Sequence, residues 1–296
     1  MRNLMLFLTL TLATAPAISD SPLVINANAS LPEGPLVRDG NLLYVEFGAD
    51  TVDRWDGKTT TVFWRQPGCG PTAIVPFGKG YVISCYQTRQ IVQVSAQGKT
   101  LAAFAKDDAG GPLIGPNDGT PDGNGGMYFT TYGPADPRPI AGRVLHMRAN
   151  GLMHEVARDL QSPNGIALAP DHKSLFVAES EAGRILSFSV APDGSLTNRR
   201  VFVRLYRSGE AMDVYPDGIK FGPDGNLYVG EFSAGRILKL DAEGKTLRVI
   251  TVPAAGAPNL AFSSDGKTMY VMAVDDKTPP KYRGKVYAIP MADSGG

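Results

Sequence analysis

The stretch YPDGIKFGPDGNLYVGEF, residues 215–232, contains the tripeptide Pro-Asp-Gly twice, around Asp217 and around Asp224. Residues 219–221, which lie between the two tripeptides, alternate apolar and polar, and this period is typical of a short strand with one buried face. Asp217 therefore opens this strand, and Asp224 follows it in a turn. At about 3.3 Å per residue the two carboxylates lie roughly 20 Å apart or slightly less, so they cannot act in one site.

The composition is that of an ordinary globular protein. The chain of 296 residues has 29 basic and 29 acidic side chains and is 43% hydrophobic. Because the charges balance, the sequence has no electrostatic preference for nucleic acid or anionic lipid, and we expect neither as a partner.

The N-terminus has the pattern of a secretory signal. Met-Arg-Asn is followed by the apolar run LMLFLTLTLATA and by Ala-Pro-Ala, which ends at Ala17. We expect residues 1–17 to be a signal peptide and the mature protein, 18–296, to be periplasmic or secreted, without membrane contact. An uncleaved anchor is the alternative, but the apolar run is short for a membrane span. The sequence does not indicate an oligomeric state.

Two cysteines, Cys69 and Cys85, flank one hairpin-like segment. Since disulfides persist in oxidising compartments, export predicts a local disulfide between them, with two buried thiols as the alternative. No histidine is near either cysteine in the sequence, so a cysteine nucleophile has weak support and a zinc site of Cys and His ligands has none.

Six copies of one repeat account for nearly all of the mature chain. Each copy has a polar first residue, a short apolar stretch, a turn with Asp or Gly, and an apolar strand, and the copies start 39 to 53 residues apart. Four short strands per unit with a period in the forties are typical of a propeller blade. The sequence therefore predicts an all-β fold, a six-bladed β-propeller in a single domain, 18–296. Either residues 22–27 or residues 285–290 would close the ring.

The innermost strand of a blade begins at one rim of the central channel, so the first residues of the repeats converge there. We call them the axial residues; they are Glu33, Thr72, Asn117, Asn164, Asp217 and Asn259. Two carboxylates and several amides in one partly desolvated site repel one another or stay unsatisfied unless a cation bridges them. These oxygen donors suit Ca²⁺ best, with Mg²⁺ or Mn²⁺ as alternatives.

The competing interpretation is that each Asn-Gly or Asp-Gly pair is only a turn. Thr72 and Asn259 fit the pattern less well and are expected in the pocket wall.

The motifs EGPL, PNDG, SPNGIAL and PDGIKF resemble the sites of the gluconolactonase and regucalcin (SGL) family, which includes drug-responsive lactonase and resembles diisopropylfluorophosphatase. The resemblance covers about residues 30–290. It implies a six-bladed propeller with Ca²⁺, or another divalent cation such as Mg²⁺, Mn²⁺ or Zn²⁺, held by Glu33, Asn164 and Asp217. Asn117 is implied as a further ligand or a substrate contact. The sugar-lactone members carry an arginine where this chain has Gly115, so we expect a lactone or ester less polar than a sugar lactone.

The resemblance also implies hydrolysis of a small-molecule lactone or related ester. The axial cation would make this hydrolase metal-dependent, with Asp217 as the general base or the group that orients the attacking water. Loops on the same rim are expected to form the substrate pocket. The candidates are Thr72, Tyr86, Tyr132, Glu181 and Asn259, and further Glu179, Glu231 and Asp275. Two alternatives stay open: a phosphotriesterase with the same ligands, and a non-catalytic propeller in which calcium fills the channel and a rim binds a ligand or protein.

Overall fold

The computed structural model describes residues 22–134, 140–205, 214–279 and 282–291. The predicted signal peptide lies outside these residues. The regular secondary structure of these residues is β-strand, apart from two short 3-10 helices, η1 (Phe47–Ala49) and η2 (Ser180–Ala182). No helix within the described ranges is long and apolar enough to cross a membrane.

Four separate sheets each consist of four consecutive antiparallel strands. The first contains β2 (Pro32–Arg38), β3 (Asn41–Glu46), β4 (Thr51–Trp55) and β5 (Thr60–Arg65). The second contains β6 (Pro71–Phe77), β7 (Gly80–Cys85), β8 (Gln90–Val94) and β9 (Thr100–Phe104). The third contains β10 (Pro116–Pro121), β11 (Met127–Thr131), β12 (Gly142–Met147) and β13 (Met153–Leu160). The fourth contains β14 (Pro163–Leu168), β15 (Ser174–Glu179), β16 (Arg184–Val190) and β17 (Leu196–Arg204).

The other strands form one eight-stranded sheet. One half contains β18 (Pro216–Phe221), β19 (Leu227–Glu231), β20 (Arg236–Leu240) and β21 (Thr246–Thr251). The other half contains β22 (Gly256–Phe262), β23 (Thr268–Asp276), β24 (Arg283–Pro290) and β1 (Leu23–Ala29). One residue pair, Glu231 with Ala257, joins β19 to β22.

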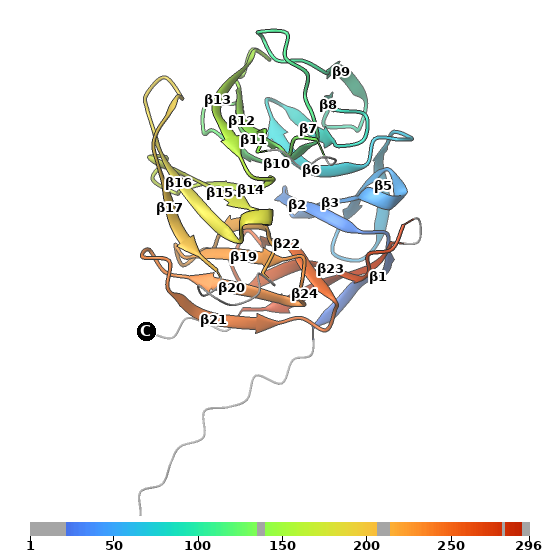
Figure 1. The fold of residues 1–296 in the computed structure, drawn as a ribbon. Coiled ribbons are helices and arrows are strands. Elements are labelled where there is room, and N and C mark those ends of the chain that lie inside the picture. The colour runs from blue at the N-terminus through green and yellow to red at the C-terminus, as the bar shows by residue number, and fades with distance from the viewer. Residues whose placement is uncertain (1–21, 135–139, 206–213, 280–281, 292–296) are drawn as a thin grey trace, which may run out of the picture.

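The first strands of these groups surround a central channel. β2, β6, β10, β14, β18 and β22 contact one another in this order, and β22 also contacts β2. Figure 1 shows the sheets arranged around this ring, with their later strands farther out. The fold is therefore an all-β propeller, as the repeats predict.

Both ends of the chain contribute to the closure of the ring. β1 pairs antiparallel with β24, so the N-terminal strand is the outer strand of a sheet whose other strands are C-terminal. The two segments that the sequence offered as alternatives thus lie side by side in one sheet.

The hydrophobic core lies between neighbouring sheets. Leu43 and Val45 of β3, for example, form one cluster with Ile74 of β6 and Ile83 of β7. Every residue of β7, β11 and β19 is buried, because these second strands are covered on both faces. This explains their nearly continuous apolar sequences.

A β-bulge positions each axial residue. The antiparallel register is interrupted next to all six, for example between Pro216 and Ile219 and between Pro163 and Ile166. A proline precedes every axial residue, at Pro32, Pro71, Pro116, Pro163, Pro216 and Pro258. Proline has no N–H to donate and is tolerated in a sheet at such irregular positions, and a bulge changes the direction of the side chain next to it.

Candidate active site at the channel mouth

A cavity of about 660 Å³ opens at one mouth of the channel. Five of the six axial residues line it: Glu33, Thr72, Asn117, Asn164 and Asp217. The sixth, Asn259, is buried behind them and donates a hydrogen bond from Nδ2 to Glu33 Oε2 at 3.2 Å. The predicted convergence of these side chains is therefore present.

The glycines that follow the axial residues are in strands, not turns. A Cβ atom at Gly165 would lie 2.1 Å from the carbonyl oxygen of Asp217, and one at Gly218 would lie 2.1 Å from Cγ of Asn259. Both positions need glycine because a neighbouring inner strand approaches closely. The interpretation of these Asn-Gly and Asp-Gly pairs as simple turns is wrong.

Hydroxyl groups hold the backbone at three axial positions. Thr130 Oγ1 donates to Asn164 O at 2.7 Å, and Ser180 Oγ donates to Pro216 O at 2.6 Å. Thr72 Oγ1 lies 3.1 Å from Pro116 O and 3.2 Å from Asn117 O. In each case a residue of one repeat fixes the start of the next inner strand, so Thr72 supports Asn117 as well as lining the cavity.

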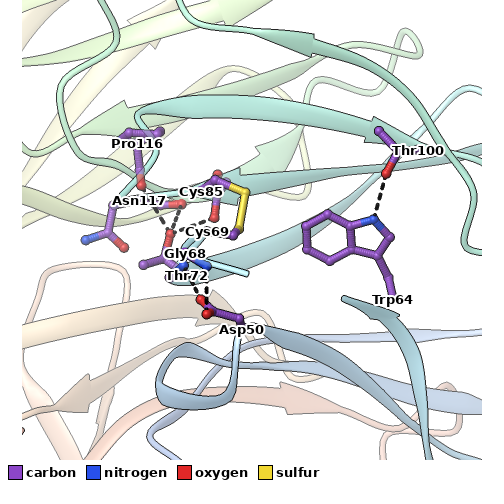
Figure 2. Close-up of a disulfide and its surroundings, with 11 residues drawn as sticks. Asp50, Trp64, Gly68, Cys69, Thr72, Cys85, Thr100, Pro116 and Asn117 are labelled. Carbon is purple, nitrogen blue, oxygen red and sulfur yellow. Dashed lines mark hydrogen bonds between the residues drawn. A yellow bond between two sulfur atoms is a disulfide. The ribbon is translucent and has the colours of Figure 1, made fainter. Parts of the chain in front are cut away.

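Cys69 and Cys85 form a disulfide beside these contacts. Figure 2 shows the disulfide next to Thr72, whose hydroxyl points at the backbone of Pro116 and Asn117. Asp50 accepts hydrogen bonds from the N–H groups of Gly68 and Gly70, which flank Cys69. The loop before β6 is thus held on both sides of the cysteine.

The two axial carboxyl groups both favour their protonated forms. Burial, together with the nearby charges of Asp217 and Asp118, raises the pKa of Glu33 well above its usual range. Burial and the charge of Asp118 raise the pKa of Asp217 to about 8, against the opposing effect of a hydrogen bond from Asn164. The charge of Lys277 also opposes the rise at Asp217, but burial dominates. Such shifts are common at functional sites.

The donor set fits a hard divalent cation. Carboxylate oxygens from Glu33 and Asp217 and amide oxygens from Asn117 and Asn164 are all ligands that Ca²⁺ prefers. A cation there would also relieve the repulsion that raises the two pKa values. Among the described residues, no cluster of three or more His, Cys, Asp or Glu side chains is placed to hold a metal, so this set needs its amides.

The wall of the cavity follows a repeat of its own. In five of the six groups, the residue directly after the second strand lines the cavity. Its backbone N–H donates to the carbonyl of the residue two places before an axial residue. We call these the rim residues; they are Phe47, Tyr86, Tyr132, Ser180 and Phe232. Lys277, directly after β23, lines the same wall.

Aromatic rings dominate one side of this wall. Tyr86 contacts Phe47 and Tyr132 edge to face, with ring centroids 6.3 Å apart in both pairs. Burial raises the pKa of Tyr132 to about 12. Gly115 lies under the two tyrosines: its φ is +62°, and a Cβ there would meet Tyr86 Cε2 at 2.9 Å. An arginine at this position would therefore collide with the rings.

Three predicted wall residues are wrong. Glu179 and Glu231 are fully buried at the ends of β15 and β19, where they pair with Arg184 and Arg236. Each precedes a rim residue by one position, and successive residues of a strand point to opposite faces. Asp275 is exposed, pairs with Lys285 and does not line the cavity. Glu181 does line it.

Several further residues line the cavity and were not predicted from the sequence: Leu31, Phe47, Ser180, Tyr215, Phe232, Ser233 and Lys277. Ser180 and Phe232 could have been found by aligning the repeats on Tyr86 and Tyr132, since all four hold the same place. The proline before each axial residue is a second signal that the sequence offered.

Known proteins resemble this chain in sequence, and solved structures resemble it in fold. The chain is 26% identical over 281 residues to a gluconolactonase of Zymomonas mobilis subsp. mobilis, covering 84% of this chain and 78% of that one. It is 26% identical to a regucalcin of Xenopus laevis, over 86% of both chains. The solved structure of a calcium-binding regucalcin of Agrobacterium tumefaciens str. C58 matches with a TM-score of 0.76 at 17% identity. The match covers 91% of this chain and 93% of that one, and it shows the fold. The SMP-30/Gluconolactonase/LRE-like region family matches residues 31–275, and the chain belongs to that family.

Proposed function

We propose that this protein is a metal-dependent hydrolase of a lactone or related ester. The observation that carries the proposal is the meeting of Glu33, Asn164 and Asp217 at one open cavity, with both carboxyl groups shifted toward protonation. Relatives named gluconolactonase support the substrate class. An open concave site with convergent polar groups is the usual form of a small-molecule site.

Glu33, Asn117, Asn164 and Asp217 would hold the cation, with Ca²⁺ as the first choice and Mg²⁺, Mn²⁺ or Zn²⁺ as substitutes. When bound, the cation would polarise the substrate carbonyl and stabilise the negative charge that develops on its oxygen. Glu33 is better placed as a ligand than as a base, since Oε2 already accepts hydrogen bonds from Asn259 and from the N–H of Gly34.

Asp217 is the proposed general base. In its carboxylate form it accepts a proton from the water that attacks the carbonyl carbon, and it holds that water in place. Its carboxyl group is buried at the cavity, and burial favours the protonated form that follows the proton transfer. The hydroxyl of Ser180, bonded to Pro216 O, fixes the backbone on which Asp217 stands.

The wall favours a substrate less polar than a sugar lactone. Phe47, Tyr86 and Tyr132 offer ring faces and edges on one side, and the close approach of two tyrosines to Gly115 leaves no space for an arginine that would bind sugar hydroxyls. Aromatic surface excludes water and binds apolar groups.

A substrate panel tests the proposal. We expect aryl or alkyl lactones to be hydrolysed faster than glucono-δ-lactone, with activity lost in EDTA and restored by Ca²⁺. Turnover of a paraoxon-type phosphotriester alone would identify the phosphotriesterase instead. No turnover of any substrate by protein with its full complement of cation would indicate the non-catalytic propeller.

We also propose that the ring has six blades in a single domain, 18–296. This counts the two halves of the eight-stranded sheet as separate blades, which is reasonable because one residue pair joins them. Export to the periplasm or the medium is part of the proposal, and the Cys69–Cys85 disulfide suits an oxidising compartment.

A further inference from the structure

An ion pair crosses the channel beneath the candidate site. Lys220 Nζ lies 3.0 Å and 3.3 Å from the two carboxylate oxygens of Asp118. The residues are 102 positions apart, on β18 and β10, and β14 packs between these two strands. The pair therefore spans the channel and does not lie within one sheet.

The pair lines a different cavity from the candidate site. Asn117 and Asp217, on the same two strands, line the cavity of about 660 Å³ at the candidate site. Asp118 and Lys220 line a second cavity of about 260 Å³ toward the other end of the inner strands. The side chain of Asp118 is 3% exposed and that of Lys220 is 23% exposed, so the lysine reaches the carboxylate from the open side.

Asp118 is close enough to the site to matter electrostatically. Its negative charge contributes to the raised pKa of both Glu33 and Asp217. Glu33, Asp118 and Asp217 would together present three negative charges along the channel, and the ammonium group of Lys220 offsets one of them. Lys277, which lines the candidate-site cavity, also acts on Asp217 and opposes the rise of its pKa, so the two lysines together limit the negative charge offered to a cation.

We propose that Lys220 is a built-in counter-ion that sets the charge available to the axial cation and so favours a divalent over a trivalent ion. This inference rests on the proposed function, because it needs the axial residues to hold a cation. It assigns a task to two residues that neither bind the cation nor touch the substrate.

A charge series tests it, with Ca²⁺ affinity measured by calorimetry and Tb³⁺ affinity by luminescence sensitised through Tyr86 and Tyr132. Lys220→Met should raise Ca²⁺ affinity at least about tenfold, and Tb³⁺ affinity about thirtyfold, because Coulomb energy scales with the charge of the ion. Asp118→Asn should weaken both ions, and Tb³⁺ more. The double variant should bind within about threefold of the wild type.

The outcomes are distinguishable. If the wild-type protein binds neither ion, the proposed cation site itself fails. A second outcome is that the wild-type protein binds both ions while the two single variants leave the ratio of Tb³⁺ affinity to Ca²⁺ affinity unchanged, or shift it in the same direction. That result overturns only the counter-ion role. Circular dichroism checks folding, and if Lys220→Met does not fold, the fall in the ratio for Asp118→Asn decides the matter.

Discussion

Two aspartates with identical neighbours stand at the two ends of β18. Asp217 is 7% exposed and lies beside other acids, and burial and the charge of Asp118 raise its pKa to about 8. Asp224 lies in the turn after the strand, and hydrogen bonds from Lys239, Asn226 and Tyr228 lower its pKa despite partial burial. The tripeptide is the same, so contacts between sheets, not local sequence, decide which carboxyl group can do chemistry.

The two glycines of these tripeptides make the same point. Gly225 has a φ of +76° and open space where a Cβ would be, so the turn conformation alone requires it. Gly218 is in a strand, and the amide of Asn259 fills the place of its Cβ. One glycine is needed for backbone conformation and the other for close packing at the channel.

The largest expected difference is in catalysis. Asp217→Asn keeps the shape and one oxygen but removes the negative charge and the proton acceptor, so kcat should fall at least about a hundredfold. Asp224→Asn is the matched control, since the same change is made between the same neighbours, and its kcat should stay within about twofold of the wild type. Steady-state kinetics on the preferred lactone measures both.

Equal losses in the two variants, or a loss only in Asp224→Asn, would contradict the axial position of the base. A large loss in kcat without loss of Ca²⁺ affinity in Asp217→Asn would separate the proton-acceptor role from the ligand role.

Removal of the cation should also affect variants at the two ends of β18 differently. Ca²⁺ at about 100 times its Kd should add about 2.7 kcal/mol to the free energy of unfolding by mass action. Wild-type protein and Asp224→Asn should gain equally in melting temperature, while Asp217→Asn should gain less because a ligand charge is missing. Scanning calorimetry with and without a chelator measures this. If chelation leaves the melting temperature unchanged, and elemental analysis shows that the metal is gone, the result would count against the site.

In protein freed of metal by a chelator, the contributions of Asp217 and Asp224 to stability should change with pH in opposite directions. The pKa of Asp217 is higher folded than unfolded, so its stability contribution is complete below about pH 4 and is lost as the pH rises through about 8. The pKa of Asp224 is lowered, so its contribution is present above about pH 4 and lost on acidification. Glu33 adds to the loss at high pH.

Melting temperatures of the chelated protein between about pH 5 and about pH 8 test these signs. The wild type should become less stable as the pH rises, Asp217→Asn should show a shallower slope, and Asp224→Asn should keep the wild-type slope. A chelated wild type whose melting temperature rises over this range would refute the unpaired burial of the axial carboxyl groups.

Much of the fold and half of the site were predictable, because both repeat along the chain. The inner strands, the axial residues and the neighbouring cysteines follow from spacing, and Tyr86 and Tyr132 were found at the rim. The errors at Glu179 and Glu231 arose from a shift of one residue, which turns a side chain from the cavity into the protein. The Asp118–Lys220 pair was beyond prediction, since its residues meet only when two inner strands that are not neighbours in the ring both extend side chains into the channel.

The smallest expected effect is on the stability of the far turn. Asp224 accepts hydrogen bonds from Tyr228 Oη at 3.0 Å and from the N–H of Asn226 at 3.1 Å, and it pairs with Lys239 at 2.6 Å. Asparagine retains an acceptor oxygen and is a good turn residue, so Asp224→Asn mainly loses a partly exposed ion pair, which contributes up to about 1 kcal/mol. Urea unfolding should show a loss of about 1 kcal/mol or less, and the loss should shrink as salt is raised. A loss above about 2 kcal/mol that does not respond to salt would mean that this turn, and not only the axial end, anchors β18 in the ring.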